Sequence, residues 1–175
     1  MSSPSPLRAC GECTLCCKVM GVGEIGKAQG VWCQHCEIGQ GCKIYETRPG
    51  ECRTFDCAWL HDTRLGADWR PDRARFVLAY ELGGKRLTVR CDPARPDAWK
   101  KQPYHAGLRA LARQGAPRGQ YVMVDSGGRA IVMLPERDVD LGIVREDERI
   151  VTTLWGPNPD AIKVHESDPR ARGFA

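Results

Sequence analysis

The feature that most constrains this chain is the density of cysteine near its start. Nine of the ten cysteines lie before residue 58, and five of them fall within the twenty-five residues from 33 to 57. A chain concentrates thiols in this way either to form disulfides or to bind soft metal ions. The cellular compartment usually decides between the two uses. The nine residues are Cys10, Cys13, Cys16, Cys17, Cys33, Cys36, Cys42, Cys52 and Cys57.

The rest of the sequence favours a reducing compartment. No stretch approaches about eighteen consecutive apolar residues, so we expect no transmembrane helix and no membrane association. The opening residues, MSSPSPLRAC, lack the apolar run that a secretory signal needs. We therefore expect a cytoplasmic protein. Because cytosolic thiols stay reduced, this location favours metal ligation over a disulfide scaffold, with a thiol redox centre as a third interpretation.

The net charge of +4 does not single out a nucleic-acid partner. It arises from 26 basic and 22 acidic side chains, and the whole excess lies after residue 65. There the basic side chains are interspersed with acidic ones, a pattern typical of a solvated surface and not of a binding stripe. We do not expect nucleic-acid binding, and a protein partner is left open.

Residues 10–65 are expected to form an irregular, metal-held cysteine-rich module. Apolar residues here show almost no helical or strand period, and glycine is frequent. We expect this backbone to fold around bound metal and not around a hydrophobic core. Short helices or turns are predicted at residues 13–19, 44–46 and 53–60. Residues 1–9, which are rich in serine and proline, are expected to form a mobile tail.

Residues 66–155 are expected to form a small antiparallel sheet with one packed helix. Two pairs of strand-like segments are separated by Gly-Gly at 83–84 and at 127–128, which is a strong hairpin signal. Between these pairs, residues 104–114 place apolar side chains on one helical face. The whole chain is thus predicted to be an α+β fold, with residues 156–175 as a second mobile tail. The predicted strands lie at 75–82, 85–90, 121–124, 129–134, 139–144 and 150–154.

Clustered thiolates suit either zinc or an iron–sulfur cluster. The spacing Cys10-x2-Cys13-x2-Cys16 matches the first three ligands of a bacterial ferredoxin, although the Cys-Pro that normally follows is missing. The Cys33-x2-Cys36 pair suits half of a zinc site equally well. Each tetrahedral ion or cubane cluster uses four thiolates, so nine cysteines suffice for two centres with one left over. The sequence predicts that these nine residues hold an iron–sulfur cluster or iron, or alternatively about two zinc ions.

The remaining metal-ligating residue types are interpreted as ordinary. His35 lies within the cysteine-rich stretch and could replace a thiolate, but a surface imidazole is the simpler interpretation. His61, His105 and His165 lack a recognisable ligand spacing. Cys91 stands alone at the end of a predicted strand, where we expect it to be buried and inert.

Two blocks of the cysteine-rich module resemble the YkgJ-type cysteine-cluster proteins. The first is the Cys-x2-Cys-x2-Cys-Cys run that begins at Cys10, and the second joins GCKIYETRP at 41–49 to CRTFDC at 52–57. Proteins of this bacterial family are described as zinc- or iron-chelating, or as containing an iron–sulfur cluster. The resemblance covers residues 10–60 and says little about residues 66–175.

The resemblance implies metal-ligand roles for eight cysteines. One of these is Cys33 or Cys36, both of which are present in this chain. It implies no settled activity; flagellin lysine methylases contain a similar cysteine arrangement, but no methyl-donor site is visible here. The other seven implied ligands are Cys10, Cys13, Cys16, Cys17, Cys42, Cys52 and Cys57.

Several residues between the cysteines are candidates for shaping a metal site. Arg48 and Arg53 are expected either to donate to metal-bound sulfur or to serve as ordinary turn and surface residues. Tyr45, Phe55 and Trp59 are expected to shield the site from water.

Three functions follow from this interpretation. The first is a metal-binding protein whose iron–sulfur cluster or iron serves redox chemistry or electron transfer. The alternatives are a structural zinc module that mediates a protein interaction, and a metal delivery or storage protein. The sequence contains no Ser-His-Asp set, phosphate loop, dinucleotide fingerprint or paired-carboxylate motif that would name an enzyme. Whether the protein is an enzyme is therefore left open.

Overall fold

A computed structural model describes residues 8–174, which divide into two compact units. The first unit runs to Ala79 and adds Arg90–Trp99, and the second contains Tyr80–Val89 and the residues from Lys100 onward. In this division the start of the next strand and residues 90–99 group with the cysteine-rich segment. Within residues 8–174, no helix is long and apolar enough to cross a membrane.

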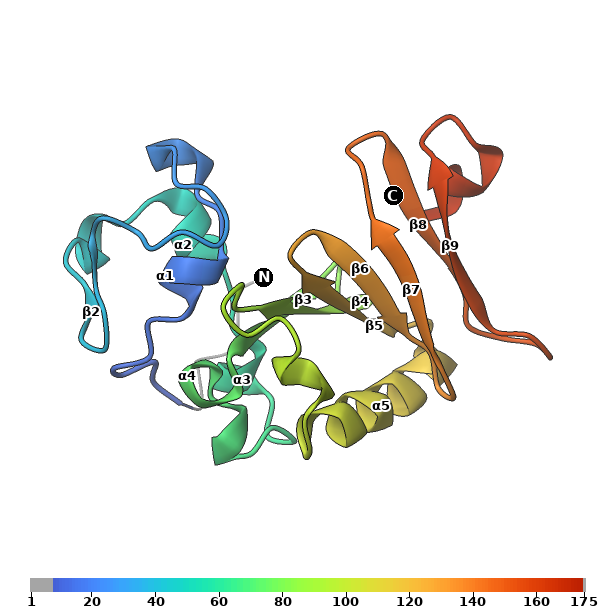
Figure 1. Ribbon diagram of the computed structural model, residues 1–175, viewed down its shortest axis with the longest axis horizontal. Coiled ribbons are helices and arrows are strands. Elements are labelled where there is room, and N and C mark those ends of the chain that lie inside the picture. Colours follow the sequence, from blue (N-terminus) through green and yellow to red (C-terminus); the bar gives the residue numbers. More distant parts are fainter. Residues whose placement is uncertain (1–7, 175) are drawn as a thin grey trace. The chain divides into compact units, whose positions relative to one another are not determined.

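Up to Ala74, the first unit contains short helical turns and one pair of two-residue strands (Figure 1). Such short elements are expected where glycine is frequent and no helical period is present. Of the helices or turns predicted at 13–19, 44–46 and 53–60, the first is a shorter helix over Cys16–Val19 and the second is a turn over Tyr45–Thr47. The third is replaced by two separate helices, Gly50–Thr54 and Ala58–His61. The elements of this unit are α1 (Cys16–Val19), η1 (Gly23–Ile25), β1 (Cys36–Glu37), β2 (Gly41–Cys42), η2 (Tyr45–Thr47), α2 (Gly50–Thr54), α3 (Ala58–His61), η3 (Ala67–Trp69) and α4 (Pro71–Ala74).

A small hydrophobic cluster lies within the first unit. Leu15, beside α1, and Val19, within it, pack with Val77 of β3 (Phe76–Glu81), and all three are almost fully buried. We expected bound metal in place of such a core. The structure differs because Val77, which is distant in sequence from the cysteines, completes the cluster. Partly buried side chains around it are Cys13, Cys16, Met20 and Phe55.

A buried ion pair ties α1 to the segment that follows β4 (Arg86–Cys91). Lys18 Nζ lies 2.6 Å from Asp92 Oδ1, with side-chain exposures of 16% and 7%. The same carboxylate accepts a hydrogen bond from the Ala94 N–H at 3.0 Å. Burial alone would raise the pKa of Asp92, but the hydrogen bonds from Lys18 and Ala94 outweigh it and hold the pKa below its ordinary value. The pair therefore stabilises the placement of α1 within its unit.

Both predicted hairpins are confirmed. The turn between β3 and β4 contains Gly83-Gly84, and the turn between β5 (Tyr121–Ser126) and β6 (Arg129–Met133) contains Gly127-Gly128. These four glycines have φ angles between 63° and 86°. Glycine adopts this left-handed region without the Cβ strain that other residues suffer.

The hairpins and β7 (Asp138–Ile143) form a five-stranded sheet in the order β3-β4-β5-β6-β7. In the second unit, α5 (Tyr104–Gly115) packs against β5 and β6 with Leu108 and Ala112 buried, as the helical face over 104–114 predicts (Figure 1). Arg109 fixes the helix further, since its Nη2 lies 2.8 Å from Asp138 on β7. The observed class is therefore mixed α+β, as predicted. Two short turns complete the helical elements, η4 (Ala98–Lys100) and η5 (Ala116–Arg118).

Residues 156–175 differ from the mobile tail that we expected. β9 (Asp160–His165) pairs antiparallel with β8 (Glu148–Thr153) in a separate two-stranded sheet, and η6 (Pro169–Phe174) follows. Ala161 and Val164 of β9 are buried, and Ala161 joins a hydrophobic cluster of the second unit. The strand predicted at 150–154 thus belongs to this pair and not to the main sheet. Of the tail expected at residues 1–9, all but residues 8 and 9 lies outside the described residues.

Candidate metal centre

The first cysteine-bearing segment is a tight turn that leads into α1. The Cys13 N–H donates to the Cys10 carbonyl at 3.1 Å, and the Cys17 N–H donates to the Thr14 carbonyl at 3.0 Å. Leu15 anchors the segment in the hydrophobic cluster, which also holds Cys16 partly buried. Four cysteines are thereby presented within two short turns.

The second segment is hydrogen-bonded directly to the first through the backbone. The Cys33 N–H donates to the Cys17 carbonyl at 3.0 Å, and the Cys36 N–H donates to the Cys33 carbonyl at the same distance. Cys36 and Cys42 face each other across the β1–β2 pair. This arrangement brings three further cysteines beside α1.

The third segment carries Cys52 on α2. A glutamate of η1, Glu24, accepts hydrogen bonds from the N-terminus of this helix. The Glu51 N–H donates to Glu24 Oε1 at 2.9 Å. Hydrogen bonds from the backbone N–H groups of Glu51 and Gly50 lower the pKa of Glu24, which shows a carboxylate bound at a helix start. Residues 23–25 therefore fix the helix that presents Cys52.

Six cysteines are linked through their effects on the pKa values of Cys17, Cys36, Cys52 and Lys27. The hydrogen bond with the Cys16 thiol, followed by burial, raises the pKa of Cys17 far above its ordinary value. Burial raises the pKa of Cys36 to about 11, and the neighbouring thiolates Cys17 and Cys33 add to this. Burial likewise raises the pKa of Cys52, again with a contribution from neighbouring thiolates. We call Cys16, Cys17, Cys33, Cys36, Cys42 and Cys52 the first cysteine set.

The remaining three clustered cysteines form a second set, Cys10, Cys13 and Cys57. Burial raises the pKa of Cys57 to about 11; the thiolates of Cys10 and Cys13 also raise it, and the backbone N–H groups of Trp59 and Leu60 partly offset the effect. Burial raises the pKa of Cys10 as well, with further increases from Cys13 and Cys17.

Lys27 places a positive charge beside the first cysteine set. Its ammonium donates to the carbonyls of Lys18 (3.1 Å), Met20 and Ala28 (3.1 Å). Burial lowers the pKa of Lys27, whereas the thiolates of the first cysteine set act in the opposite direction. Sequence reasoning missed this residue, because no local pattern shows that the loop from 20 to 28 folds back onto α1.

The two arginines serve the chain turn around η2. Arg48 Nη1 donates to the Tyr45 carbonyl at 2.7 Å, while Arg53 donates to the carbonyls of Arg48 (2.9 Å) and Glu46 (3.0 Å). Arg48 also lies close enough to lower the pKa of Cys10, although burial outweighs this effect. The ordinary turn role expected as one alternative for Arg48 is confirmed, and Arg53 supports the same turn.

The aromatic residues expected to shield the site behave differently from one another. Tyr45 is 56% exposed, with the Arg48 guanidinium 3.9 Å from its ring centroid, so it does not wall off the cysteines. Phe55 is partly buried against the hydrophobic cluster. Trp59 is also partly buried, and its Nε1 donates to the Gly66 carbonyl at 3.0 Å.

The structure also shows the surroundings of Cys91, His35 and His61, which the sequence analysis interpreted as ordinary residues. Cys91 is buried at the end of β4, as expected. His35 Nε2 lies 3.3 Å from the Gln34 side-chain nitrogen. His61 Nε2 lies 2.6 Å from Asp56 Oδ1, and its other ring nitrogen is buried without a hydrogen-bond partner among residues 8–174.

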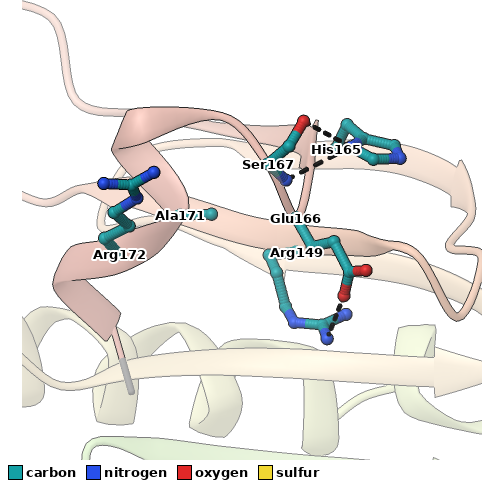
Figure 2. Close-up of a pocket in the computed structure, with 6 residues that line it drawn as sticks. All are labelled: Arg149, His165, Glu166, Ser167, Ala171 and Arg172. Carbon is teal, nitrogen blue, oxygen red and sulfur yellow. Dashed lines mark hydrogen bonds and ion pairs between the residues drawn. The ribbon is translucent and has the colours of Figure 1, made fainter.

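A shallow hollow of about 460 Å³ lies beside β8 and β9 in the second unit (Figure 2). Within it, Ser167 Oγ and the Ser167 N–H lie 2.8 and 3.2 Å from His165 Nδ1. Asp147 lies 3.5 Å from the other ring nitrogen, and all three side chains are exposed. Since both contacts of Ser167 close the same tight turn, we assign this group a structural role. The lining residues are Arg149, His165, Glu166, Ser167, Ala171 and Arg172.

The donor chemistry of the two cysteine sets fits a soft metal, although the ligands are not yet assembled. All ten cysteines are free thiols. In the part of the chain that the structure describes, no three His, Cys, Asp or Glu side chains are already arranged as ligands of one ion. Thiolate sulfur is nevertheless the preferred ligand of zinc, iron–sulfur clusters and other soft centres. Metal binding would require these thiols to lose their protons and draw together.

Comparison with known proteins adds no assignment. No protein-family model matches the chain, and no curated protein or solved structure is significantly similar to it.

Proposed function

We propose that residues 10–57 bind metal through cysteine thiolates, and that the bound group is an iron–sulfur cluster or iron. The observation that carries the proposal is the backbone pairing that joins cysteine-bearing segments: the Cys33 N–H donates to the Cys17 carbonyl at 3.0 Å, and Cys36 pairs with Cys42 across β1 and β2. Membership of the YkgJ-type family is part of this proposal.

The bound group would supply reversible one-electron chemistry, so the proposed role is redox chemistry or electron transfer. The residues of this chain hold the thiolates in place, and Lys27 offsets part of their negative charge from the carboxyl end of α1. The raised pKa values of Cys36 and Cys52 mean that binding must displace protons, so metal affinity should increase with pH. Such thiols require a reducing compartment, for which we propose the cytoplasm.

A structural zinc module is the second candidate. It is favoured by the number of clustered cysteines, since nine suffice for two four-thiolate sites with one left over. In that case residues 10–57 would be stabilised by zinc, and the second unit would be available to a protein partner.

Elemental analysis and visible absorption would separate the two candidates. The protein should be purified without oxygen from cells supplied with iron and zinc. Iron, with inorganic sulfide and brown colour, supports the first candidate, whereas about two colourless zinc ions per chain support the second. Protein that contains neither metal would contradict both.

A matched pair of variants tests the ligand assignment. Cys52→Ser removes a member of the first cysteine set, and Cys91→Ser removes a buried cysteine that lies outside both sets. We expect Cys52→Ser to lose at least one metal equivalent and Cys91→Ser to keep all of them. Unchanged metal content in Cys52→Ser would show that this residue is not a ligand.

A further inference from the structure

The β1–β2 hairpin places Cys36 and Cys42 directly opposite each other in its antiparallel register. The His35 carbonyl, which precedes Cys36, accepts a hydrogen bond of 2.8 Å from the N–H of Lys43, which follows Cys42. A ladder bond that flanks two opposed residues in this way marks a non-hydrogen-bonded pair. The Cα atoms of such a pair lie about 4.5 Å apart, and both side chains project from the same face.

This backbone geometry suits a disulfide. Disulfides join residues whose Cα atoms are about 4.4–6.8 Å apart and whose Cβ atoms are on average about 3.8 Å apart. Directly opposed residues of an antiparallel pair have Cβ atoms about 4.5–5.5 Å apart, and the smaller value applies where the pair is not hydrogen-bonded. A shift of about 1 Å within the hairpin therefore lets the two sulfurs bond.

The hairpin is held in this register by two further contacts. The Gln40 N–H donates to the Glu37 carbonyl at 2.9 Å and closes the turn. The Gly39 N–H donates to the Thr14 hydroxyl at 3.2 Å, and Thr14 itself is only 5% exposed. The fold thus keeps the two cysteines opposed before any reaction, which raises the effective concentration of one thiol at the other.

Both thiols are accessible to a small reagent. Cys36 and Cys42 are each partly exposed, whereas Cys57 and Cys91 are buried. Disulfides in reducing compartments are usually transient and serve catalysis or redox sensing. Exposed disulfides are more easily reduced than buried ones, as a reversible switch requires.

We propose that Cys36 and Cys42 form a redox switch, which closes into a disulfide by exchange with a small disulfide such as oxidised glutathione. One cysteine thiolate attacks the glutathione disulfide, forms a mixed disulfide and releases one glutathione thiolate. The other cysteine thiolate attacks the protein sulfur of the mixed disulfide, forms the Cys36–Cys42 bond and releases the second glutathione. The two cysteine protons pass to the two glutathione thiolates, so the pair loses two electrons and the glutathione disulfide gains them.

The switch controls how many thiolates are available for metal. A sulfur in a disulfide is no longer a thiolate, which is the form that binds metal. Closing the switch leaves seven of the nine clustered cysteines, one too few for two four-thiolate centres. This consequence rests on the proposed function, whereas the disulfide itself depends only on the hairpin.

Disulfide mapping of the full-length protein tests the pair directly. Reduced, metal-free protein, with its fold checked by circular dichroism, is equilibrated with mixtures of reduced and oxidised glutathione and then alkylated. Proteolytic cleavage after Glu37 separates the two cysteines, and fragmentation of the linked peptides in a mass spectrometer distinguishes Cys36 from Cys33. We expect Cys36–Cys42 to be the first linkage to form as the share of oxidised glutathione increases. The preference should be lost in urea, because it depends on the hairpin.

Three variants show whether the partner is correct. Cys42→Ser removes the thiol that displaces glutathione, so mixed disulfide on Cys36 should increase by about tenfold or more. Cys17→Ser should keep the Cys36–Cys42 linkage, although the Cys17 thiol hydrogen-bonds with Cys36 and is therefore the competing partner. Cys91→Ser, which removes a buried cysteine at the end of β4, is the matched control and should behave as the wild type.

The metal content is then measured after reduced and oxidised samples are incubated with zinc and desalted. We expect the oxidised protein to hold at least one zinc ion fewer per chain, and reduction to restore it. Linkage of Cys36 to Cys17 or Cys33 in the wild type would overturn the inference, as would equal zinc content in the two samples once the Cys36–Cys42 bond is mapped. If the reduced protein binds neither zinc nor iron, the proposed function fails, while a mapped Cys36–Cys42 bond still supports the switch.

Discussion

The substitution Leu15→Ala tests whether the first unit has a core of its own. Leu15 is 4% exposed and packs with Val19 and Val77. Leucine-to-alanine changes at such sites cost about 2–5 kcal/mol, from lost burial and from the cavity that remains. We expect about 3 kcal/mol, because the cluster is small and its partly buried rim can relax. With a urea slope of about 2 kcal/mol/M, the midpoint should fall by about 1.5 M.

The assay is urea unfolding followed by tryptophan fluorescence, which reports chiefly on the first unit because four of the five tryptophans lie there. It is run on reduced protein with metal and with a chelator. Val31→Ala is the control, since Val31 is 57% exposed in the same segment and should change stability by less than about 0.5 kcal/mol. A Leu15→Ala effect no larger than this would refute the hydrophobic cluster as the organiser of the unit.

Two further predictions concern residues that hold the first unit together. The folded-state pKa of Asp92 lies below its ordinary value of 3.8. The ionised carboxylate therefore contributes fully to the free energy of unfolding above about pH 4, and this contribution is lost as the pH falls through the folded-state pKa. Urea unfolding should therefore show that Asp92→Asn is less stable than the wild type at pH 6, and that the difference in free energy of unfolding becomes smaller toward pH 3. A difference that does not change with pH would contradict this. Gly30→Ala should cost about 1–3 kcal/mol, because φ is +79° and a Cβ would lie 2.9 Å from Pro93 Cγ. The same assay should show a smaller loss of stability for Gly26→Ala, where φ is +61° but no atom lies within 4 Å of the added Cβ. Equal losses of stability would show that the contact with Pro93 does not contribute.

Local sequence signals predicted most of the second unit. Glycine pairs between strand-forming segments located both hairpins, and the apolar face over 104–114 located α5. β9 was missed because prolines precede and follow it and because only Ala161 and Val164 are buried. Its stability comes from pairing with β8, which is not a property of its own residues.

The first unit was less predictable, because its organisation is non-local. Val77 completes a cluster with Leu15 and Val19 across about sixty residues of chain, and no periodic pattern marks that contact. The cysteines themselves were evident from spacing. The position of Lys27 was not, since it depends on a loop that folds back on α1.

X-ray absorption at the edge of the bound metal, on anaerobically purified protein, tests the central claim most directly. The account predicts that sulfur dominates the atoms bound to the metal, at about 2.3 Å for either zinc or an iron–sulfur cluster. A coordination sphere of nitrogen and oxygen alone would show that the clustered cysteines are not ligands, and would contradict the proposed function.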